Sequence, residues 1–267
     1  MTRREQRRLA FLRVSGWEHV QITPLAGDAS NRRYLRLTGN PDHRRAILMD
    51  ADPKTVGMQQ AFVEMASYLI DAGFSAPHIF AADLAQGFVL LEDFGDAVFA
   101  RMLVDAPAQE AALYRSAADC LAALHRQPAA KHLLQTTPDV LAKLIAPAFE
   151  WYAAKAAPDN TQNAQTATVA LLANSLQRHV PQCSVTVLRD FHAENLIWLP
   201  GRKGICRVGL LDFQDAVIGH PAYDLVSLTR DARRDLGPGV AALTTEHYLS
   251  RADVESAPFL DAAAVLS

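Results

Sequence analysis

The residues best suited to chemistry lie in two short stretches, 188–195 and 210–215. The first reads Leu-Arg-Asp-Phe-His-Ala-Glu-Asn and holds Asp190 and Asn195, and the second reads Leu-Leu-Asp-Phe-Gln-Asp and holds Asp212. A carboxylate can orient a hydroxyl and accept its proton, and carboxylate and amide oxygens bind magnesium. Polar turns between core strands are also common. The second Asp, at a matching spacing after an apolar run, favours phosphate chemistry over an ordinary pair of turns.

Three apolar runs around these stretches predict the strands that position them. The runs are residues 185–188, 196–199 and 208–211. Period-2 segments bounded by turn residues are typical of strands. We expect a small antiparallel unit in which Asp190, Asn195 and Asp212 lie next to one another at strand ends.

The first 91 or so residues predict a strand-rich unit with few helices. Helices are expected at residues 3–14 and 58–72, and strands at 20–25, 32–37, 46–50, 77–80 and 87–91. Alternation along the second strand puts Arg33 on the face of Leu35 and Leu37, where a bare charge is costly unless paired. An anionic ligand, Glu64 on the helix, or Asp212 could pair it. The small-residue turn that holds Gly27, Asp28 and Ser30 can present backbone N–H groups to phosphate, and an ordinary hairpin turn stays open.

The second part of the chain predicts a helical unit. Ala- and Leu-rich helical patterns cover residues 111–125, 138–155, 169–180, 222–228 and 239–267, with a polar surface loop at 156–166. We place the boundary in the turn at 92–96, which gives units of residues 1–92 and 93–267. Trp151 and Tyr152 suit either a sugar-stacking surface or the helix core. Asp224, after a turn into a helix, is expected to cap or brace rather than react.

Composition indicates a soluble globular protein of 267 residues, long enough for one large domain or two lobes. Half of the residues are hydrophobic, 21% are charged and the formal net charge is −3, which argues against nucleic-acid or membrane-surface binding. No apolar run is long enough for a transmembrane helix. The three scattered cysteines indicate reduced thiols, so we expect a cytoplasmic protein. We also expect a monomer or a weak dimer.

Taken together, these motifs resemble a known family. The two Asp-bearing stretches look like the catalytic and metal loops of aminoglycoside phosphotransferases and protein kinases. Several sequence segments look closer to the bacterial N-acetylmuramate/N-acetylglucosamine anomeric kinases, namely residues 27–34, 47–51, 188–195, 212–216 and 219–225. The resemblance implies an α+β, two-lobed protein-kinase-like fold, with an antiparallel-sheet N-terminal lobe and a mainly helical C-terminal lobe.

The resemblance also implies a reaction and a set of roles. With ATP and Mg²⁺ as cofactors, the anomeric hydroxyl of N-acetylmuramate, N-acetylglucosamine or both would be phosphorylated to the sugar 1-phosphate, in peptidoglycan recycling. Asp190 would orient the hydroxyl and accept its proton, and Asn195 and Asp212 would hold magnesium. The other implied positions are Gly27, Asp28, Ser30, Arg33, Glu92 and Phe94 for the nucleotide, His192, Glu194, Trp151, Tyr152 and Asp215 for the small amino-sugar substrate, and Glu64 and Asp224 as supports.

Three departures from the family pattern matter. Leu188 stands where the family has a His, and Met49 stands where the third strand usually carries a Lys that contacts the α- and β-phosphates. Either Arg33 replaces that Lys, braced by Glu64, or the chain binds nucleotide weakly and is not a kinase. The presence of Asp190, Asn195 and Asp212 favours the first interpretation. Relatives continue with further helices, so we also expect an incomplete acceptor site in this chain.

Two other functions stay open. One is an aminoglycoside or other small-alcohol phosphotransferase, because one fold supports several acceptors. The acidic residues of the helical part are spread out among lysines, which argues against a polycationic acceptor. The other is a non-catalytic nucleotide- or sugar-binding module.

Overall fold

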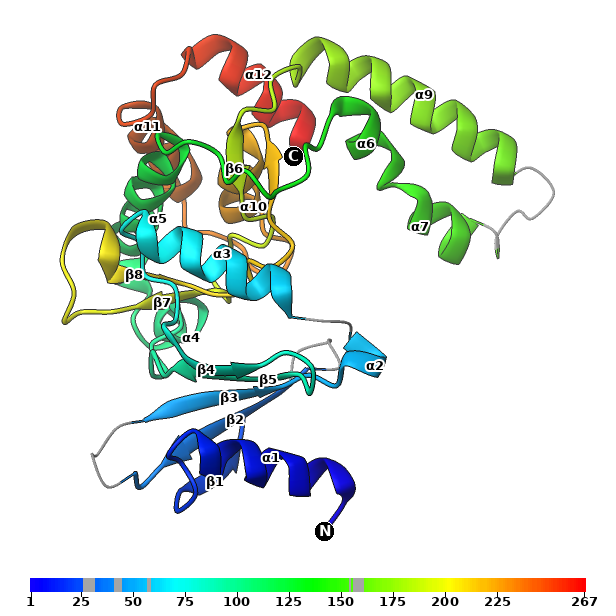
Figure 1. The fold of residues 1–267 in the computed structure, drawn as a ribbon. Coiled ribbons are helices and arrows are strands. Elements are labelled where there is room, and N and C mark those ends of the chain that lie inside the picture. The colour runs from blue at the N-terminus through cyan, green and yellow to red at the C-terminus, as the bar shows by residue number, and fades with distance from the viewer. Residues whose placement is uncertain (26–31, 41–44, 57–58, 154, 156–160) are drawn as a thin grey trace. The chain divides into compact units, whose positions relative to one another are not determined.

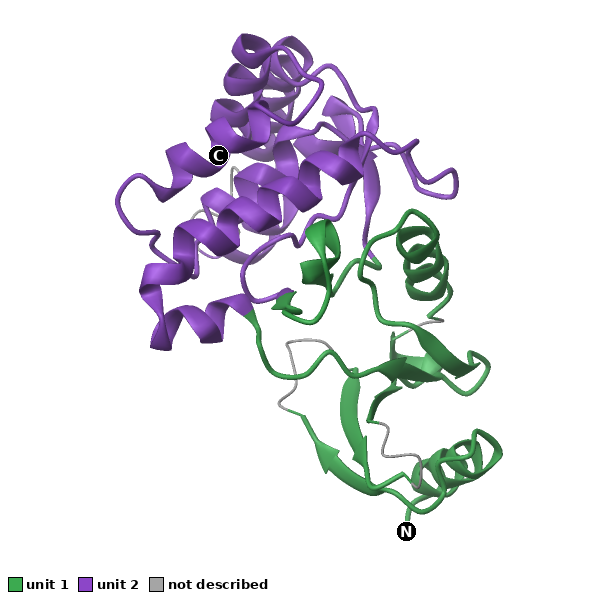
Figure 2. Cartoon of the chain, turned by 90° about the vertical axis from the view of Figure 1, so that its left-hand side faces the viewer, with its two compact units in different colours: residues 1–98, 197–214 green, residues 99–196, 215–267 purple. Residues whose placement is uncertain are grey.

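The computed structural model describes residues 1–25, 32–40, 45–56, 59–153, 155 and 161–267. Gly27, Asp28 and Ser30, predicted to contact the nucleotide, lie outside the described residues. The chain packs as two compact units, residues 1–98 with 197–214 and residues 99–196 with 215–267 (Figure 2). A single cut after residue 92 was expected. The first unit instead extends to residue 98 and takes in the later segment that carries Asp212.

The centre of the first unit is a five-stranded sheet of order β1-β2-β3-β5-β4 (Figure 1). Its strands are β1 (Gln21–Pro24), β2 (Arg33–Thr38), β3 (Ala46–Asp50), β4 (Ile79–Asp83) and β5 (Phe88–Glu92). Every neighbouring pair is antiparallel. The predicted strands are confirmed, with β4 shifted a few residues along the chain.

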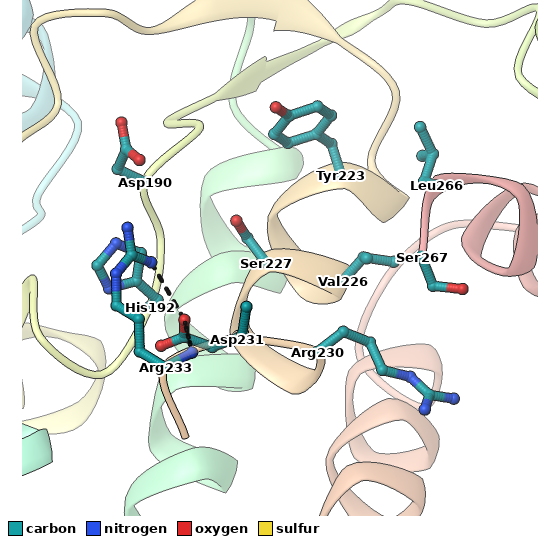
Figure 3. Close-up of a pocket in the computed structure, with 11 residues that line it drawn as sticks. Asp190, His192, Tyr223, Val226, Ser227, Arg230, Asp231, Arg233, Leu266 and Ser267 are labelled. Carbon is teal, nitrogen blue, oxygen red and sulfur yellow. Dashed lines mark hydrogen bonds and ion pairs between the residues drawn. The ribbon is translucent and has the colours of Figure 1, made fainter. Parts of the chain in front are cut away.

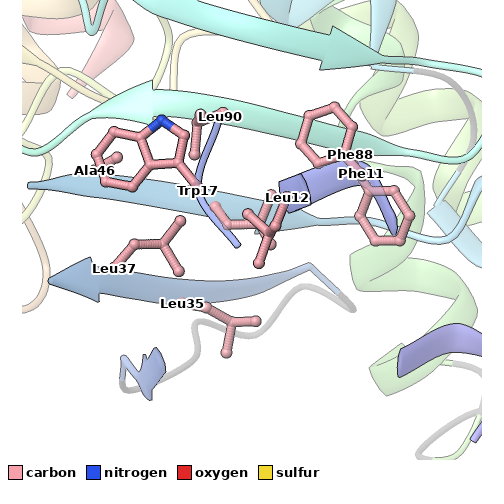
Figure 4. Close-up of a cluster of buried hydrophobic side chains, with 9 residues drawn as sticks. Phe11, Leu12, Trp17, Leu35, Leu37, Ala46, Phe88 and Leu90 are labelled. Atoms are coloured by element: carbon pink, nitrogen blue, oxygen red, sulfur yellow. The ribbon is translucent and has the colours of Figure 1, made fainter. Parts of the chain in front are cut away.

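Helix α1 (Arg3–Val14) covers one face of this sheet. Thr2 caps its N-terminus and exchanges hydrogen bonds with Glu5, which satisfies backbone donors that the first turn leaves unpaired. Phe11 of α1 stacks on Phe88 of β5 with ring centroids 5.5 Å apart. The buried cluster between helix and sheet consists of Phe11, Leu12, Trp17, Leu35, Leu37, Ala46, Leu48, Phe88 and Leu90 (Figure 4). The face of β2 that carries Leu35 and Leu37 is therefore the face under α1.

The other face of the sheet carries Met49, whose side chain is completely buried. Helix α3 (Gln60–Asp71) lies on this side of the sheet, and the short helix α2 (Pro53–Val56) precedes it. The apolar positions of α3 recur at helical spacing, and Phe62, Met65 and Leu69 are buried. The position expected for a cleft-facing Lys is thus filled by an apolar core side chain.

Segment 197–214 belongs to the first unit because Ser75 ties it there. The Ser75 carbonyl accepts from Leu210 N at 2.8 Å, and its hydroxyl donates to the Cys206 carbonyl at 2.7 Å. The segment contains most of β7 (Leu196–Trp198) and all of β8 (Val208–Leu210), which pair in a two-stranded sheet, and the short helix η4 (Gly204–Arg207). Gly209 lies against Phe94, so that a Cβ there would stand 2.9 Å from the ring.

The second unit is mainly helical. Among the described residues its helices are α4 (Phe99–Asp105), η1 (Pro107–Gln109), α5 (Glu110–His125), α6 (Pro138–Lys143), α7 (Ala146–Ala148), η2 (Phe149–Ala153), α9 (Thr161–His179), α10 (Ala222–Thr229), α11 (Val240–Leu249) and α12 (Ser256–Leu266). Helix α5 forms much of its core and packs against α11. At their interface Tyr248 and His125 share a hydrogen bond of 2.7 Å.

Three helix predictions in this unit were wrong in extent. The one over 239–267 is interrupted at residues 250–255, between α11 and α12. A continuous helix over 138–155 is broken into α6, α7 and the π-helical turn η2, because Pro147 lacks an N–H and clashes with the preceding turn. Residues 161–166, predicted as part of a polar loop, begin α9 instead. Gln and Ala favour helices while the exposed face of α9 is polar, so polarity there indicated solvent and not irregular structure.

The strands around the Asp190 loop pair differently from the prediction. β6 (Val185–Val187) pairs antiparallel with β9 (Val217–Gly219), and β7 pairs with β8. The expected single antiparallel unit is thus two separate two-stranded sheets. Across the described ranges, no helix combines the length and the apolar character that a membrane crossing requires.

Candidate active site

Helix α10 fixes the loop that carries Asp190. The Asp224 carboxylate accepts hydrogen bonds from Leu188 N at 2.6 Å and Arg189 N at 2.9 Å. The Ser227 hydroxyl donates to the Arg189 carbonyl at 3.0 Å. Arg189 has φ of 72°, a left-handed conformation that costs a non-glycine residue about 1–3 kcal/mol unless its surroundings hold it. These three hydrogen bonds hold the strained residue directly before Asp190.

Asp224 is fully buried, and its pKa is raised from 3.8 to about 7. Burial is the main cause, because a carboxylate loses its hydration there. The two backbone N–H groups lower the pKa of Asp224, and the charge of Asp190 raises it. The carboxyl group therefore titrates near neutral pH while it braces the loop.

Asn195 is held by its amide nitrogen. Nδ2 donates to the Asp190 carbonyl at 3.0 Å and lies 3.3 Å from His192 Nε2. A carbonyl oxygen can only accept, so the amide nitrogen and not the amide oxygen must face it. This orientation turns Oδ1 away from the loop, which suits an amide oxygen that binds a metal ion.

Asp212 follows β8 and is the second non-glycine residue with a left-handed backbone among those described, with φ of 56°. The next residue, Phe213, is completely buried and stacks on Phe62 of α3, with ring centroids 5.1 Å apart and 17° between the planes. Gln214 Nε2 donates to Asp212 Oδ1 at 2.8 Å. The anchored ring and the amide together fix a carboxylate that remains 30% exposed.

The cation beside Asp212 is Arg32. Its Nη1 lies 3.8 Å from Asp212 Oδ1, and its side chain is only 15% exposed. Arg33 does share a face with Leu35, as alternation predicted, but that face belongs to α1, and Arg33 itself is exposed. Its register partner is Asp50, to which Arg4 of α1 is ion-paired at 2.6 Å.

Two of the three partners offered for Arg33, Asp212 and Glu64, have other contacts. Asp212 pairs with Arg32, and Glu64 is exposed on α3 and accepts a hydrogen bond of 2.7 Å from Gln60. The alternation contained the necessary signal, because Arg32 and Tyr34 follow the period of the opposite face. What the sequence did not tell is which face α1 would cover.

Glu92 and Phe94 lie where β5 leaves the sheet. Arg202 donates from Nη2 to Glu92 Oε1, and its guanidinium carbon stands 4.9 Å from the centroid of the Phe94 ring. The Glu92 carboxylate also accepts from His78 N at 3.3 Å. The Glu92 side chain is thus engaged within the first unit.

A cavity of about 260 Å³ lies beside Asp190 in the second unit (Figure 3). Residues from the Asp190 loop, α10 and the turn after α10 line it, among them Asp190, His192, Tyr223, Ser227, Asp231 and Arg233. Carboxylates and guanidinium groups both stand on its wall. Asp231 was missed from sequence, because one Asp in an Arg-rich turn resembles any solvated turn.

The remaining predicted substrate residues do not line this cavity. Glu194 and Asp215 are exposed. Trp151 and Tyr152 are 66% and 77% exposed on η2, so the alternative that they are core aromatics is wrong. Only His192 of the predicted substrate residues stands on the wall beside Asp190.

The fold is the protein-kinase-like fold of aminoglycoside phosphotransferases. The solved structure of the ADP-bound aminoglycoside phosphotransferase APH(2'')-Ib superposes with a TM-score of 0.67 at 14% identity, covering 97% of this chain and 85% of that one. The α+β class, with an antiparallel sheet in the first unit and helices in the second, agrees with this fold as predicted.

The model of the phosphotransferase enzyme family (APH) matches residues 21–260, and the chain belongs to this family. The N-acetylmuramate/N-acetylglucosamine kinase of Caulobacter vibrioides is 37% identical over 291 residues, which cover 96% of this chain and 80% of the relative. The protein of the same name from Pseudomonas aeruginosa is 33% identical over 82% of this chain. This chain spans 63% of that relative's length.

Proposed function

We propose that the protein transfers the γ-phosphoryl group of ATP to the anomeric hydroxyl of N-acetylmuramate, N-acetylglucosamine or both. The names of the curated relatives, similar over most of this chain, support this choice of acceptor. The observation that carries the proposal is the Asp190 loop, since Asp224 and Ser227 hold it rigidly beside a cavity. The product would be a sugar 1-phosphate, formed in the cytoplasm for peptidoglycan recycling.

Asp190 is the catalytic residue of the proposal. It stands on the cavity wall and would accept the proton of the sugar hydroxyl as the oxygen attacks phosphorus. An anomeric hydroxyl is more acidic than an ordinary alcohol, so a weakly basic carboxylate suffices. Because phosphoryl transfer passes through a loose transition state, positioning supplies much of the rate enhancement.

Asn195 and Asp212 are the proposed magnesium ligands. The fit rests on Asn195 Oδ1, which two contacts of its amide nitrogen turn outward, and on the partly exposed Asp212 carboxylate. Both supply the oxygen donors that Mg²⁺ prefers. When bound, the ion would neutralise charge on the phosphates.

Arg32 is the proposed phosphate-binding cation in place of the usual third-strand Lys. Met49, at the Lys position, is completely buried and carries no charge. Arg32 brings a guanidinium to within 3.8 Å of Asp212, while Arg33 lies exposed on the α1 face. A guanidinium binds phosphate oxygens in a bidentate manner. Glu92 and Phe94, at the end of β5, stay predictions as nucleotide-binding residues.

An ADP-release assay with several acceptors tests the proposal. We expect turnover with N-acetylmuramate or N-acetylglucosamine, none with the methyl glycoside of N-acetylglucosamine, whose anomeric oxygen is blocked, and little with kanamycin. Asp190→Ala is the control for background hydrolysis. Turnover with kanamycin alone would overturn the acceptor, and turnover with the methyl glycoside would overturn the anomeric position.

A further inference from the structure

The second unit holds another cavity, of about 310 Å³, next to the one beside Asp190. Tyr223 of α10 lines both cavities (Figure 3), and Arg189, which lines the second, directly precedes Asp190 in the chain. Consecutive Cα atoms are about 3.8 Å apart. The second cavity therefore adjoins the place where the proposed reaction occurs.

The wall of this second cavity is largely apolar. Its apolar side chains include Val140 and Leu141 of α6, Leu144 directly after α6, Val187 of β6 and Val217 of β9. Val140 and Leu144 remain 43% and 51% exposed, so part of this wall is open to solvent. Open apolar surfaces that converge on a few polar groups are typical of small-molecule sites.

Arg189 is the one residue with a full charge on this wall, within the part of the chain that the structure describes. His220 also lines the cavity, but burial lowers its pKa from 6.5 to about 4, so its ring is neutral at pH 7. No described carboxylate lines the cavity to balance the charge of Arg189. A cavity with one cation and no anion favours a ligand group that carries a single negative charge.

The Arg189 guanidinium is available to such a ligand. The backbone of Arg189 is bound by Asp224 and Ser227, while its guanidinium has no hydrogen bond or ion pair with the described residues. The residue is half-buried, and its nitrogen atoms are not among the enclosed ones, so they keep accessible surface. A half-buried charge beside apolar groups is costly until a counterion binds.

We propose that this cavity is the subsite for the lactyl ether group of N-acetylmuramate, with the lactyl carboxylate bound by Arg189. The inference rests on the proposed function and adds a specificity residue to it. N-acetylmuramate differs from N-acetylglucosamine by this one group, which carries an anion and a methyl group. A guanidinium binds a carboxylate through two parallel hydrogen bonds, and the apolar wall suits the methyl group. Arg189 would thus distinguish the two sugars.

The test measures sugar binding without ATP, by calorimetric titration of each sugar into the full chain. The readout is the selectivity, defined as Kd for N-acetylglucosamine divided by Kd for N-acetylmuramate. We expect Arg189→Gln to lower this ratio about tenfold or more, because a charge-assisted pair with the carboxylate is lost. The ratio is informative because damage to the Asp190 loop would weaken the binding of both sugars.

Lys143→Gln is the matched control. Lys143 is exposed at the end of α6 and does not line the cavity, so its substitution removes an equal charge without removing the proposed contact. The selectivity of this variant should change less than about twofold, because solvent and salt screen a charge at that position.

The methyl ester of the N-acetylmuramate carboxyl group tests the same contact from the ligand. It keeps the lactyl group but not its charge, so it should bind the wild type about tenfold more weakly than N-acetylmuramate does. Relative to N-acetylglucosamine, the ester should show no further loss with Arg189→Gln. If Arg189→Gln does not fold, Arg189→Asn takes its place, since Asn tolerates the left-handed backbone at this position.

The outcomes separate this inference from the proposed function. An unchanged selectivity in Arg189→Gln, or an equal fall in Lys143→Gln, would overturn the subsite and leave the reaction if turnover persists. Binding of N-acetylglucosamine without binding of N-acetylmuramate would also overturn the subsite. Selectivity that depends on Arg189, in a protein that phosphorylates neither sugar, would support the subsite and overturn the reaction. Absence of both binding and turnover in the wild type would overturn both.

Discussion

The first unit offers Arg32, beside Asp212, as the proposed phosphate-binding cation. Met49 stands where the family usually has a Lys. A side chain at position 49 is enclosed by the sheet and its neighbours, so a charged group there would be costly. Arg32 directly precedes β2 and approaches Asp212 from the face opposite α1. The proposed cation therefore lies just before β2 and not on β3.

We predict that Arg32→Ala raises KM for ATP about tenfold or more, because a charge-assisted contact with phosphate is lost. Arg33→Ala, one residue away but exposed on the α1 face, is the matched control and should change KM for ATP less than about twofold. Steady-state kinetics at saturating sugar measures both. The reverse ranking would restore Arg33 as the phosphate contact.

The ionisation of Asp224 predicts a pH dependence of stability. Its pKa is raised from 3.8 to about 7, so the folded state holds the proton more tightly than the unfolded state does. This contribution is fully present below about pH 4 and is lost as pH rises through about 7. Chemical unfolding from pH 4 to 8 should show this fall in the wild type.

Asp224→Asn is the control, because an amide does not titrate. In that variant the free energy of unfolding should lose this component of its pH dependence, although the substitution itself weakens a backbone contact. Identical pH profiles in the two proteins would show that Asp224 does not titrate in this range.

At the scale of elements, much of the architecture follows from sequence periodicity. The five strands of the first unit and α1 were predicted because alternation and amphipathic spacing are strong there. The predicted long helix over 138–155 was wrong, since the break at Pro147 outweighs the favourable residues around it. The pairing of β6 with β9 was also missed, because pairing depends on contacts distant in sequence.

The same limit explains which site residues could be predicted. Residue type and spacing are enough to select Asp190, Asn195 and Asp212 from the sequence. They are not enough to select Arg32 and Asp231, since their significance depends on which face of the sheet is covered and which carboxylate becomes buried. Burial is a property of tertiary packing and not of local pattern.

Phe62 of α3 stacks on Phe213, the residue after Asp212. We therefore predict that a substitution at Phe62 also affects the position of the Asp212 carboxylate. Phe62→Ala should lower the free energy of unfolding by about 3 kcal/mol or more and also raise the Mg²⁺ concentration needed for half-maximal activity. Phe11→Ala removes a comparable buried stack under α1 and is the control. It should destabilise the first unit without changing the Mg²⁺ requirement, and an equal rise in both variants would contradict a specific role for Phe62.

At the scale of the whole molecule, the chain order and the compact units do not coincide. The segment with Asp190 and Asn195 folds in the second unit, and the chain then returns to the first unit to place Asp212 before it re-enters the second. The backbone that carries Asn195 therefore packs with the second unit, and the backbone that carries Asp212 packs with the first. The same fold persists at 14% identity in an aminoglycoside phosphotransferase, so the acceptor must be decided by the site and not by the fold.

The most direct test of the account is the position of the transferred phosphate. The protein is incubated with ATP, Mg²⁺ and N-acetylglucosamine, and the product is analysed by phosphorus NMR with coupling to protons. We predict a phosphate coupled to the anomeric proton, formed by the wild type and reduced about 100-fold or more in Asp190→Asn, which has lost its proton acceptor. A phosphate on any other sugar oxygen, or an undiminished rate in Asp190→Asn, would contradict the account.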